Sequence, residues 1–539
     1  MARRNIKDKK ERDEKKERDS SENKIIDTIF SISTWGIPSI LLVTIISIFL
    51  KLNHSSHYKP TPKFILKLFQ RKAQPFNRKT DDERIANFLA WVVANGGSIS
   101  PSVTIESYEK YGGFGLKVVP SSTPIKKMDK LFTIPASIII SAQSVVEQYN
   151  YRIPQFQSRL YNAMNKFYHP PMVQQDIIIA LYLMIECNLG SRFRQYCEIL
   201  PTEIIPRLDT FDDDELSMLQ DEQLRNQATY SFNQLYLNWD DTLKELSHVM
   251  VRSNPQKPII TLETHFLSFK TFHKYVALVS SRTMILQGTK WLTPLADIIN
   301  YAPRNDNRIS SMSESFMVYH HHDASTGSIT VRSDRNVLGG EQIYEDYGDT
   351  DNSLFLEAHG FVPDHNPFHC AMLAPEFFPS PQDLASNLWN ALVELKSVIS
   401  PVQNFNSLPA LCVSASGTTI NSRDLNYLKL FSLFQNPKQE QQQQLCIVAS
   451  NSLIVDEILL QCIHYAGHTT AYKHILVKSA QKALSNASSS IEEDIATLAM
   501  IGKNGHVEIE KSKRVILALK FRIADKRILY HLGKLDSQR

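Results

Sequence analysis

A chain of 539 residues is longer than one ordinary domain, so its length predicts at least two folded bodies. Its 59 basic and 56 acidic residues leave a formal net charge of only +3, and no stripe of Lys and Arg is interleaved with aromatic residues, which excludes a typical nucleic-acid-binding surface. The six cysteines never approach a Cys-x-x-Cys spacing, so neither a zinc cluster nor a disulfide framework is expected, and reduced thiols fit a cytosol-facing protein.

The N-terminal region contains two contrasting segments. Residues 1–24 mix Lys, Arg, Glu and Asp with almost no apolar side chain, which predicts a disordered tail. Residues 29–50 carry no charge and are rich in Ile and Leu, and about 20 such residues cross a membrane as a helix. A single transmembrane helix is predicted here, with a signal-anchor or a buried core helix as alternatives.

Residues 52–80 are polar and contain several prolines, which is typical of a linker between an anchor and a folded body. Folding is expected to begin at Asp81, because three acidic residues at 81–83 favour the start of a helix. Two strands are predicted next, at Gly115–Val119 and Lys130–Ile134.

Apolar residues then recur at helical spacing in Gln174–Cys187 and Phe266–Val279, which predicts a helical insertion at about 145–280. The acidic stretch Asp209–Glu222 between them is expected to form a solvated helix face. Strands are predicted again at Ser315–Tyr319 and Gly327–Arg332. The whole strand-rich unit spans about 81–365.

The C-terminal region is predicted to be a second, all-helical domain at 367–535. Ser490-Ile-Glu-Glu493 has the spacing of a helix capping box, and Ile516, Leu519 and Ile523 fall on one helical face.

Four motifs in the strand-rich unit carry candidate binding chemistry. Gly112-Gly-Phe-Gly115 allows a backbone loop to lie against a ligand, or forms a plain turn. Arg282, at the end of an apolar helix, could hold a carboxylate or merely bond free helix carbonyls. Asp297-Ile-Ile-Asn300 and the stretch from Glu341-Gln342 to Tyr347-Gly348 follow, and Tyr347 alone could equally be a core tyrosine beside a turn.

The order of these motifs resembles that in the SET-domain methyltransferases, in particular the branch that includes the Rubisco large-subunit lysine methyltransferases and the actin-histidine methyltransferase. The resemblance covers residues 81–365 strongly and the C-terminal region more faintly. It implies an α+β fold in which a SET domain of small sheets with a helical insertion precedes a helical substrate-binding domain. The matching segments are Gly113-Phe-Gly-Leu116, Ser281-Arg282, Asp297-Ile-Ile-Asn300-Tyr301, Glu341-Gln342 to Tyr347-Gly348 with Asn352, and Gly360-Phe-Val362.

By resemblance, the cofactor is S-adenosyl-L-methionine and the partner is a protein substrate, with no metal and no nucleic acid. Arg282 is expected to hold the cofactor carboxylate, Asn300 to bind its amino group or adenine, and Tyr347 to be the catalytic residue. The other residues that the resemblance assigns to the cofactor are Gly113, Phe114, Gly115, Asp297 and Tyr301.

Two departures from the family pattern bear on function. Tyr301 stands where the family usually has His, which affects cofactor affinity. Met284 and Ala296 stand where the histidine-modifying branch tends to have Asn and Trp, and an apolar channel suits the alkyl stem of a lysine better than an imidazole. Lysine methylation is therefore favoured, with histidine methylation or a non-catalytic, membrane-anchored scaffold as alternatives.

The remaining motifs can be explained without a role in catalysis. His320-His321-His322 lies beside a predicted strand, and a metal site is the alternative there. Asn53-His-Ser55 and Asn486-Ala-Ser488 match N-glycosylation acceptors, which would matter only if the body were lumenal. A transport protein is excluded because one segment alone is long enough to span a membrane.

The orientation in the membrane is predicted from conflicting signals. Seven Lys and Arg residues precede the 29–50 segment and four follow it within about 20 residues, and the positive-inside rule taken alone places the body across the membrane from the cytosol. The excess is small and S-adenosylmethionine is a cytosolic metabolite, so we expect a single-pass protein whose body faces the cytosol. The residues counted are Lys9, Lys10, Arg12, Lys15, Lys16, Arg18 and Lys24 before the segment, and Lys51, Lys59, Lys63 and Lys67 after it.

Overall fold

The computed structural model divides at residue 80, and its second compact unit is Asp81–Arg539. The tail, the transmembrane segment and the linker predicted at the N-terminus lie outside the described residues. The structure describes residues 80–108, 113–167, 169–190, 192–253, 266–302, 318–348, 350–364, 366–373, 411–414, 471–503 and 509–534.

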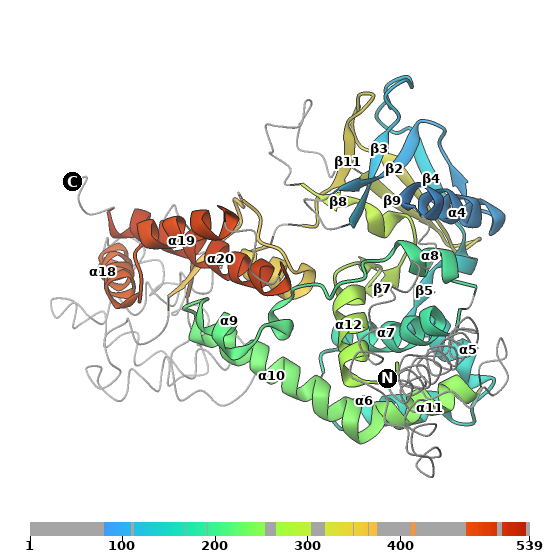
Figure 1. Ribbon diagram of the computed structural model, residues 1–539, viewed down its shortest axis with the longest axis horizontal. Coiled ribbons are helices and arrows are strands. Elements are labelled where there is room, and N and C mark those ends of the chain that lie inside the picture. Colours follow the sequence, from blue (N-terminus) through green and yellow to red (C-terminus); the bar gives the residue numbers. More distant parts are fainter. Residues whose placement is uncertain are drawn as a thin grey trace, which may run out of the picture. The chain divides into compact units, whose positions relative to one another are not determined.

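Two four-stranded sheets form the strand-rich part of the body (Figure 1). In each of them, strands from both sides of the helical insertion pair with one another, so the two halves of the chain fold together. The first has the order β1 (Ser98–Ile99), β4 (Lys130–Ile134), β10 (Ser328–Ser333) and β9 (Val318–Asp323). The second has the order β2 (Val103–Tyr108), β3 (Gly113–Val118), β11 (Gln342–Glu345) and β8 (Asn300–Tyr301).

The predicted strands are confirmed within the described residues, and burial alternates along them. Every second residue of β10 is buried, since side chains on a strand point alternately to opposite faces. Helix α4 (Asp81–Ala94) begins at the predicted acidic residues and packs Phe88 and Val92 into the same core. A smaller three-stranded sheet joins β5 (Ile140–Ser141), β7 (Thr289–Leu292) and β6 (Met284–Leu286).

Helices between β5 and β6 form the predicted insertion. Its centre is α7, Pro171–Leu189, which is apolar almost all round and buries residues on every face. Among the described helices, α7 is long and apolar enough to cross a membrane, but 67% of its apolar window is buried inside the body. The neighbouring helices are α5 (Ala142–Asn150), α6 (Phe156–Asn165), α8 (Arg194–Ile199), α10 (Glu222–Asn238), α11 (Lys244–Arg252) and α12 (Phe269–Ser280).

The expectation of a solvated helix face at Asp209–Glu222 is wrong in part. The segment is broken into a short 3-10 turn and α9 (Asp213–Ser217), and both Asp209 and Glu215 are buried. Side chains from distant segments contact these two carboxylates, in addition to Arg207, whose Nε lies 3.2 Å from Asp209. His273 Nε2 lies 3.1 Å from an Asp209 oxygen, and Arg514 Nε donates to Glu215 at 2.7 Å. His273 and Arg514 are distant in the sequence and cannot be seen in the local pattern, although Asp212, which caps α9 together with Glu215, is local.

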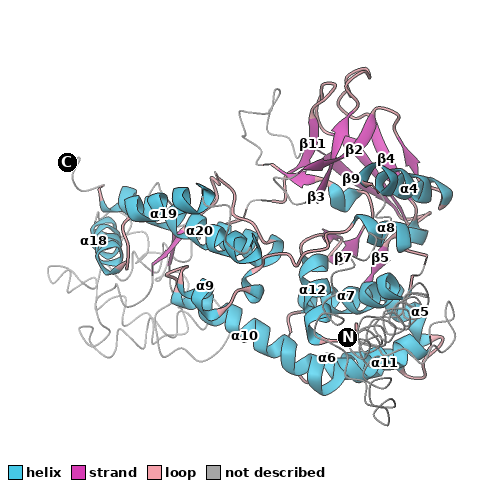
Figure 2. Ribbon diagram, viewed as in Figure 1, coloured by secondary structure: helices cyan, strands magenta, loops and turns pink. Residues whose placement is uncertain are grey.

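The C-terminal region is mostly helical but not all-helical. Figure 2 shows α18 (Ala471–Asn486), α19 (Ile491–Lys503) and α20 (Ile509–Gly533) packed together. Two short strands, β12 (Ala371–Leu373) and β13 (Leu411–Val413), pair antiparallel and add to the small core of these helices, which corrects the prediction. The predicted capping box is confirmed, because Ser490 and Glu493 bond each other's backbone N–H groups.

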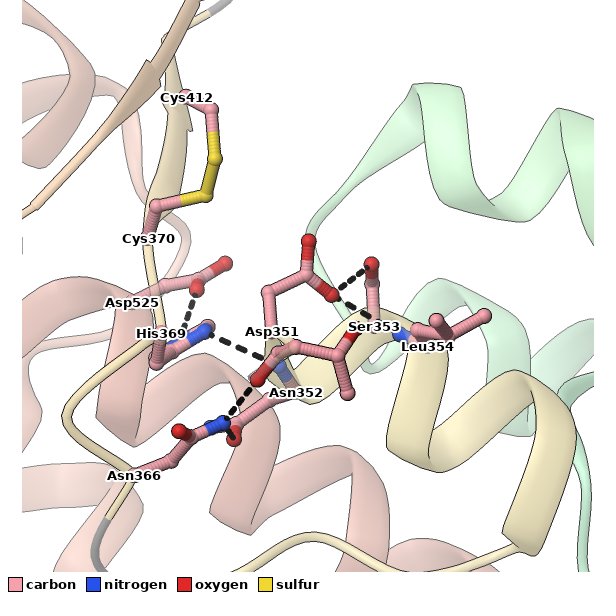
Figure 3. Close-up of a disulfide and its surroundings, with 10 residues drawn as sticks. Asp351, Asn352, Ser353, Leu354, Asn366, His369, Cys370, Cys412 and Asp525 are labelled. Carbon is pink, nitrogen blue, oxygen red and sulfur yellow. Dashed lines mark hydrogen bonds and ion pairs between the residues drawn. A yellow bond between two sulfur atoms is a disulfide. The ribbon is translucent and has the colours of Figure 1, made fainter. Parts of the chain in front are cut away.

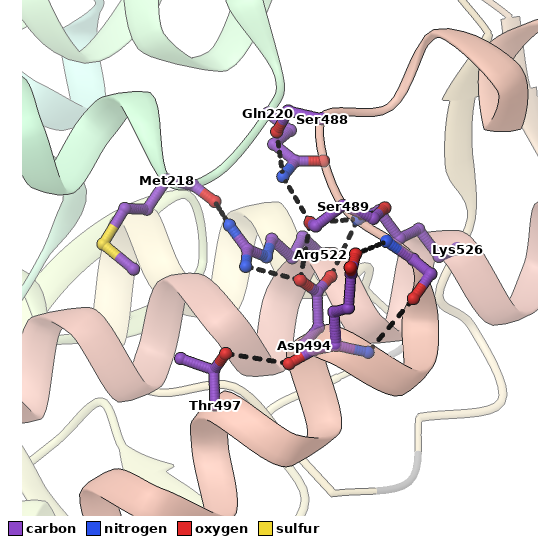
Figure 4. Close-up of polar contacts among 10 residues, drawn as sticks. Met218, Gln220, Ser488, Ser489, Asp494, Thr497, Arg522 and Lys526 are labelled. Carbon is purple, nitrogen blue, oxygen red and sulfur yellow. Dashed lines mark hydrogen bonds and ion pairs between the residues drawn. The ribbon is translucent and has the colours of Figure 1, made fainter.

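A buried carboxylate joins α19 and α20 (Figure 4). Asp494 has no exposed side-chain surface and accepts hydrogen bonds from Lys526 Nζ at 2.8 Å and from Ser489 Oγ at 2.7 Å. Arg522 also pairs with Asp494, and its other terminal nitrogen donates to the carbonyl of Met218 at 3.0 Å. Gln220 donates to Ser489 at 2.9 Å. The C-terminal helices are therefore tied to the insertion by a polar network.

Two disulfides contradict the expectation of reduced, unpaired thiols. Cys187 at the end of α7 bonds Cys197 in α8, and Cys370 beside β12 bonds Cys412 in β13 (Figure 3). Their Cα atoms are 5.5 and 5.3 Å apart, within the usual range of disulfides. The pairs are separated by 10 and 42 residues, so tertiary structure creates the proximity, and the missing Cys-x-x-Cys spacing carried no information about it.

We expect Asp494→Asn to destabilise the C-terminal helices by about 3 kcal/mol, because it leaves the buried cations Lys526 and Arg522 without their counter-charge. Urea unfolding followed by circular dichroism measures the loss. The matched control is Asp241→Asn, which removes an exposed partner of Lys166 and should cost less than about 1 kcal/mol. Equal effects of the two substitutions would contradict the prediction.

Candidate functional site

The sheet β2-β3-β11-β8 brings the sequence motifs together. Strand β11 pairs antiparallel with β3 through Ile343 and Leu116, and parallel with β8 through Tyr344 and Asn300. The glycine-rich strand, the Asn300 strand and the strand that leads into Tyr347 are thus neighbours, although they are far apart in the sequence. Gly112 lies outside the described residues.

Close packing favours glycine at position 115. A Cβ at this position would lie 2.4 Å from Asn300 Nδ2 and 2.5 Å from Gln342 Nε2, so both side chains would have to shift. Asn300 Nδ2 also donates to the Phe114 carbonyl at 3.3 Å. The absence of a side chain at Gly115 therefore lets Asn300 lie flat against the glycine-rich strand.

Arg282 and Asp297 form an ion pair in which the carboxylate is buried and the guanidinium is partly buried. Arg282 Nη1 donates to the Asp297 carbonyl at 2.8 Å and lies 3.3 Å from its carboxylate Oδ2, which has no exposed surface. The hydroxyl of Tyr196, from α8, donates to the same Oδ2 at 2.7 Å. The sequence predicts Asp297 as a cofactor residue, and the structure places it in contact with Arg282, whose guanidinium it orients.

Burial dominates the electrostatics of this group. Removal from water raises the pKa of Asp297, and the charge of Arg282 acts against that rise. Burial and the nearby carboxylate also raise the pKa of Tyr196 well above its usual range, so this phenol remains a hydrogen-bond donor. Tyr196 was missed in the sequence because it lies 101 residues before Asp297, in the insertion, with no motif around it.

Two buried polar atoms of the pair have no partner among the residues that the structure describes. They are Nε of Arg282, a donor, and Oδ1 of Asp297, an acceptor. Buried polar atoms are normally hydrogen-bonded, so each of these two atoms can still take a partner.

The backbone before Asp297 is strained. Leu295 is buried and has φ +83°, a conformation that residues with a side chain rarely adopt. It turns the chain into the 3-10 segment Ala296–Ile298 and directs Asp297 toward Arg282. Ala296, a predicted channel residue, is buried, and Met284, the other one, begins β6 and is partly exposed.

An aromatic cluster surrounds Tyr347. Its hydroxyl donates to the carbonyl of Ile299 at 2.7 Å, which fixes the ring beside the Asn300 strand. The Tyr301 ring lies 5.4 Å from that of Tyr347 and 4.8 Å from that of Phe355. We call these five residues the aromatic cluster: Tyr301, Tyr347, Phe355, His359 and Phe361.

His359 is the polar member of the aromatic cluster. Its ring lies 4.9 Å from that of Tyr347, and Nδ1 lies 3.1 Å from the Ser281 carbonyl, which requires Nδ1 to carry the proton. Burial lowers the pKa of His359 to about 4, with the charges of Arg207 and Lys290 adding to the effect and the Ser281 bond opposing it. The imidazole is therefore neutral at pH 7, with the lone pair on Nε2.

Two features of the turn after His359 favour glycine at position 360. Gly360 has φ +72°, and a Cβ there would lie 2.7 Å from the side chain of Ile205. The sequence pointed to this turn through the Gly-Phe-Val match, but assigned no role to the histidine before it.

Two groups of residues contain side chains that could bind a metal ion. His320 bonds Glu345 at 2.8 Å and the His322 ring packs on Trp291, so these histidines are engaged within strand β9 and its neighbours. Asp351, Cys370 and Cys412 also bring ligand atoms within 4.8 Å of one another, but the two sulfurs are bonded together, which leaves no thiolate for a cation.

No family model matches the chain. An actin-histidine N-methyltransferase from Papio anubis is 22% identical over 300 residues, which are 54% of this chain and 44% of that protein. The chain thus matches less than half the length of this curated relative.

Solved structures give a longer match. The SET domain of LSMT bound to lysine and AdoHcy has a TM-score of 0.57 at 16% identity, over 85% of this chain and 92% of its own. Rubisco LSMT bound to sinefungin and monomethyllysine has a TM-score of 0.56 at 17% identity, over 84% and 92%. The match is longer than residues 81–365 and so extends beyond the sheets and the insertion. The chain therefore has the SET fold, and it resembles the branch of methyltransferases to which Rubisco LSMT and the actin-histidine enzyme belong.

Proposed function

We propose that this chain is an S-adenosylmethionine-dependent protein methyltransferase whose acceptor is a lysine side chain. The observation that carries the proposal is the ion pair of Arg282 and Asp297, with one unpaired atom each, in the fold that also holds the Tyr347 cluster. The similar LSMT structures are bound to AdoMet or AdoHcy, which supports the same donor here. The 29–50 segment would anchor the enzyme to a membrane.

The residues present fit this donor. Its carboxylate can accept a hydrogen bond from Arg282 Nε, and its ammonium can donate to Asp297 Oδ1, the two atoms that lack partners among the described residues. Gly115 leaves the space that the Asn300 side chain occupies against the glycine-rich strand, and so it positions Asn300 for contact with the donor. When bound, S-adenosylmethionine supplies a methyl group on a sulfonium, which a neutral amine accepts by in-line displacement.

The aromatic cluster prepares the acceptor. Its rings exclude water, and an ammonium stem can pack on them before it loses its proton. The Tyr347 hydroxyl donates to Ile299, so its oxygen serves as an acceptor that orients an incoming amine. Methyl transfer depends more on accurate orientation of the amine than on a strong acid or base.

His359 offers a hydrogen-bond acceptor that orients the lysine amine. A neutral amine is needed for attack, and with a pKa of about 4 the His359 ring is too weak a base to hold the ammonium proton, so that proton leaves to solvent before the amine meets the donor. The Ser281 carbonyl holds the Nδ1 proton, which leaves the Nε2 lone pair as the acceptor. The structure records no hydrogen-bond partner for Nε2 among the described residues.

Lysine is preferred over histidine as the acceptor because Met284 and Ala296 offer no hydrogen bond to an imidazole. Histidine methylation is the second candidate, since the curated relative is an actin-histidine N-methyltransferase. A non-catalytic anchored scaffold is the remaining alternative, and it differs in having no working donor site.

We expect the full chain, purified in detergent, to bind S-adenosylmethionine in a calorimetric titration, and Arg282→Ala to weaken that binding at least tenfold, because a charge-assisted pair is removed. Arg282→Lys keeps the charge opposite buried Asp297 but loses the fork geometry, so it should weaken binding while remaining folded.

The matched control is Arg194→Ala, which removes an exposed guanidinium that pairs with Glu198 and should leave donor affinity unchanged. If the folded wild-type protein binds no donor, the methyltransferase proposal is wrong and the non-catalytic scaffold remains.

We expect Tyr347→Phe to retain donor binding and to lower methyl transfer about 100-fold, since it removes the hydroxyl that orients the amine. Cell-extract proteins incubated with labelled S-adenosylmethionine serve as the acceptor, and mass spectrometry identifies the modified residue. Methyl-lysine that depends on Tyr347 is the expected product. Tyr230→Phe, on the exposed surface, is the control. Methyl-histidine would instead select the second candidate.

We expect His359→Phe to slow methylation roughly tenfold, and by the same factor at pH 7.5 and at pH 9.5, because it removes an acceptor that orients the amine and does not remove a base. In the wild type, His359 is unprotonated from about pH 5 upward, so its own titration does not limit the rate in this range. A loss that shrinks at pH 9.5, where more of the lysine is already neutral, would contradict the prediction and assign His359 the role of a base.

A further inference from the structure

All four cysteines that the structure describes are paired, and the two disulfides lie in different parts of the body. Cys187–Cys197 joins the central helix α7 to α8. Cys370–Cys412 joins β12 to β13, beside the C-terminal helices. Cys187, Cys197 and Cys412 are partly exposed, so an external thiol–disulfide partner can reach them.

Paired cysteines at two separate places are rare in cytosolic proteins, because glutathione and thioredoxin keep thiols reduced there. They are common where chains fold under oxidising conditions. The pairing therefore removes the support that the scattered cysteines gave to a cytosol-facing body.

The structure also exposes a glycosylation acceptor. Asn486 is the last residue of α18, and its side chain is exposed in the turn that leads to α19. Ala487 separates it from Ser488, whose hydroxyl accepts a hydrogen bond from Gln220 at 2.7 Å. The Asn-x-Ser motif thus lies on an accessible turn rather than in the core.

The basic residues around the 29–50 segment also favour a body outside the cytosol. Seven basic residues before it and four after it favour a cytosolic tail and a body on the opposite side of the membrane. The disulfides, the exposed acceptor and this asymmetry are three separate observations. We propose that the body of this protein is translocated into an oxidising compartment, where both disulfides close and Asn486 receives an N-linked glycan.

The chemistry needs two co-reactants of that compartment. In each pair, the two thiols lose two protons and two electrons as the S–S bond forms, and a disulfide oxidoreductase takes up the electrons by thiol–disulfide exchange. At Asn486, the side-chain nitrogen loses a proton and bonds the anomeric carbon of an oligosaccharide, whose pyrophosphate carrier departs as the leaving group.

The test uses the full chain expressed in a eukaryotic cell, and none of its readouts depends on methylation. Lysates quenched with N-ethylmaleimide are digested without reductant, and peptide mass spectrometry identifies linked or alkylated cysteines. Sealed microsomes are treated with protease, and the deglycosylating amidase PNGase F is applied to wild type, Asn486→Gln and Asn53→Gln.

We expect the Cys187–Cys197 and Cys370–Cys412 peptides to be linked, the body to be protected from protease, and Asn486→Gln to abolish one PNGase F-sensitive mobility shift that Asn53→Gln leaves intact. Alkylated cysteines together with a protease-sensitive body would overturn the proposal. Zinc that co-purifies with the protein, with Cys370 and Cys412 alkylated after chelation, would overturn the second disulfide in favour of a metal site with Asp351. Protected, disulfide-bonded protein without a glycan would overturn the assignment of Asn486.

Discussion

The candidate site depends on the need to compensate one buried carboxylate. Asp297 has no contact with water, so it can remain in the core only if cations and donors surround it. Arg282 arrives from the end of α12 and Tyr196 from α8, and the strained backbone at Leu295 turns Asp297 toward both. Meeting this requirement holds the insertion against the strand that carries Asn300. The same contacts leave Arg282 Nε and Asp297 Oδ1 without partners, which is what a donor with a carboxylate and an ammonium would use.

The local motifs and the periodic elements of this site could be predicted from the sequence. Helix α7, strands β4 and β10 and the capping box at Ser490 each follow from a pattern within one stretch of chain. The motifs around Gly115, Arg282, Asn300 and Tyr347 also follow from their order along the sequence, and the SET fold brings the strands of three of them together.

Partners that come from a distant segment could not be predicted. Tyr196 carries no motif, and its role arises only when Asp297 meets it in three dimensions. Glu215 belongs to a local capping box with Asp212, and Asp209 has a local partner in Arg207, but their contacts with Arg514 and His273 join distant segments. His359 is different, because it sits within a matched turn. Its neutral state depends on burial among rings and on the Ser281 carbonyl, and neither is visible in the order of residues.

The disulfides also join distant segments of the chain, and they connect the geometry of the site to its redox state. Cys197 directly follows Tyr196, so the bond to Cys187 fixes the short helix whose phenol holds Asp297. Cys370 directly follows His369, whose ring accepts a hydrogen bond from the Asn352 backbone and lies 2.8 Å from Asp525 of α20. Helix α8 has only six residues and little stability of its own. The Cys187–Cys197 disulfide therefore helps to fix Tyr196, and through Asp297 the orientation of Arg282. Oxidation would thus support the donor site as well as the fold. An enzyme in an oxidising compartment in turn requires S-adenosylmethionine on the same side of the membrane, which makes supply of the donor a condition for its activity.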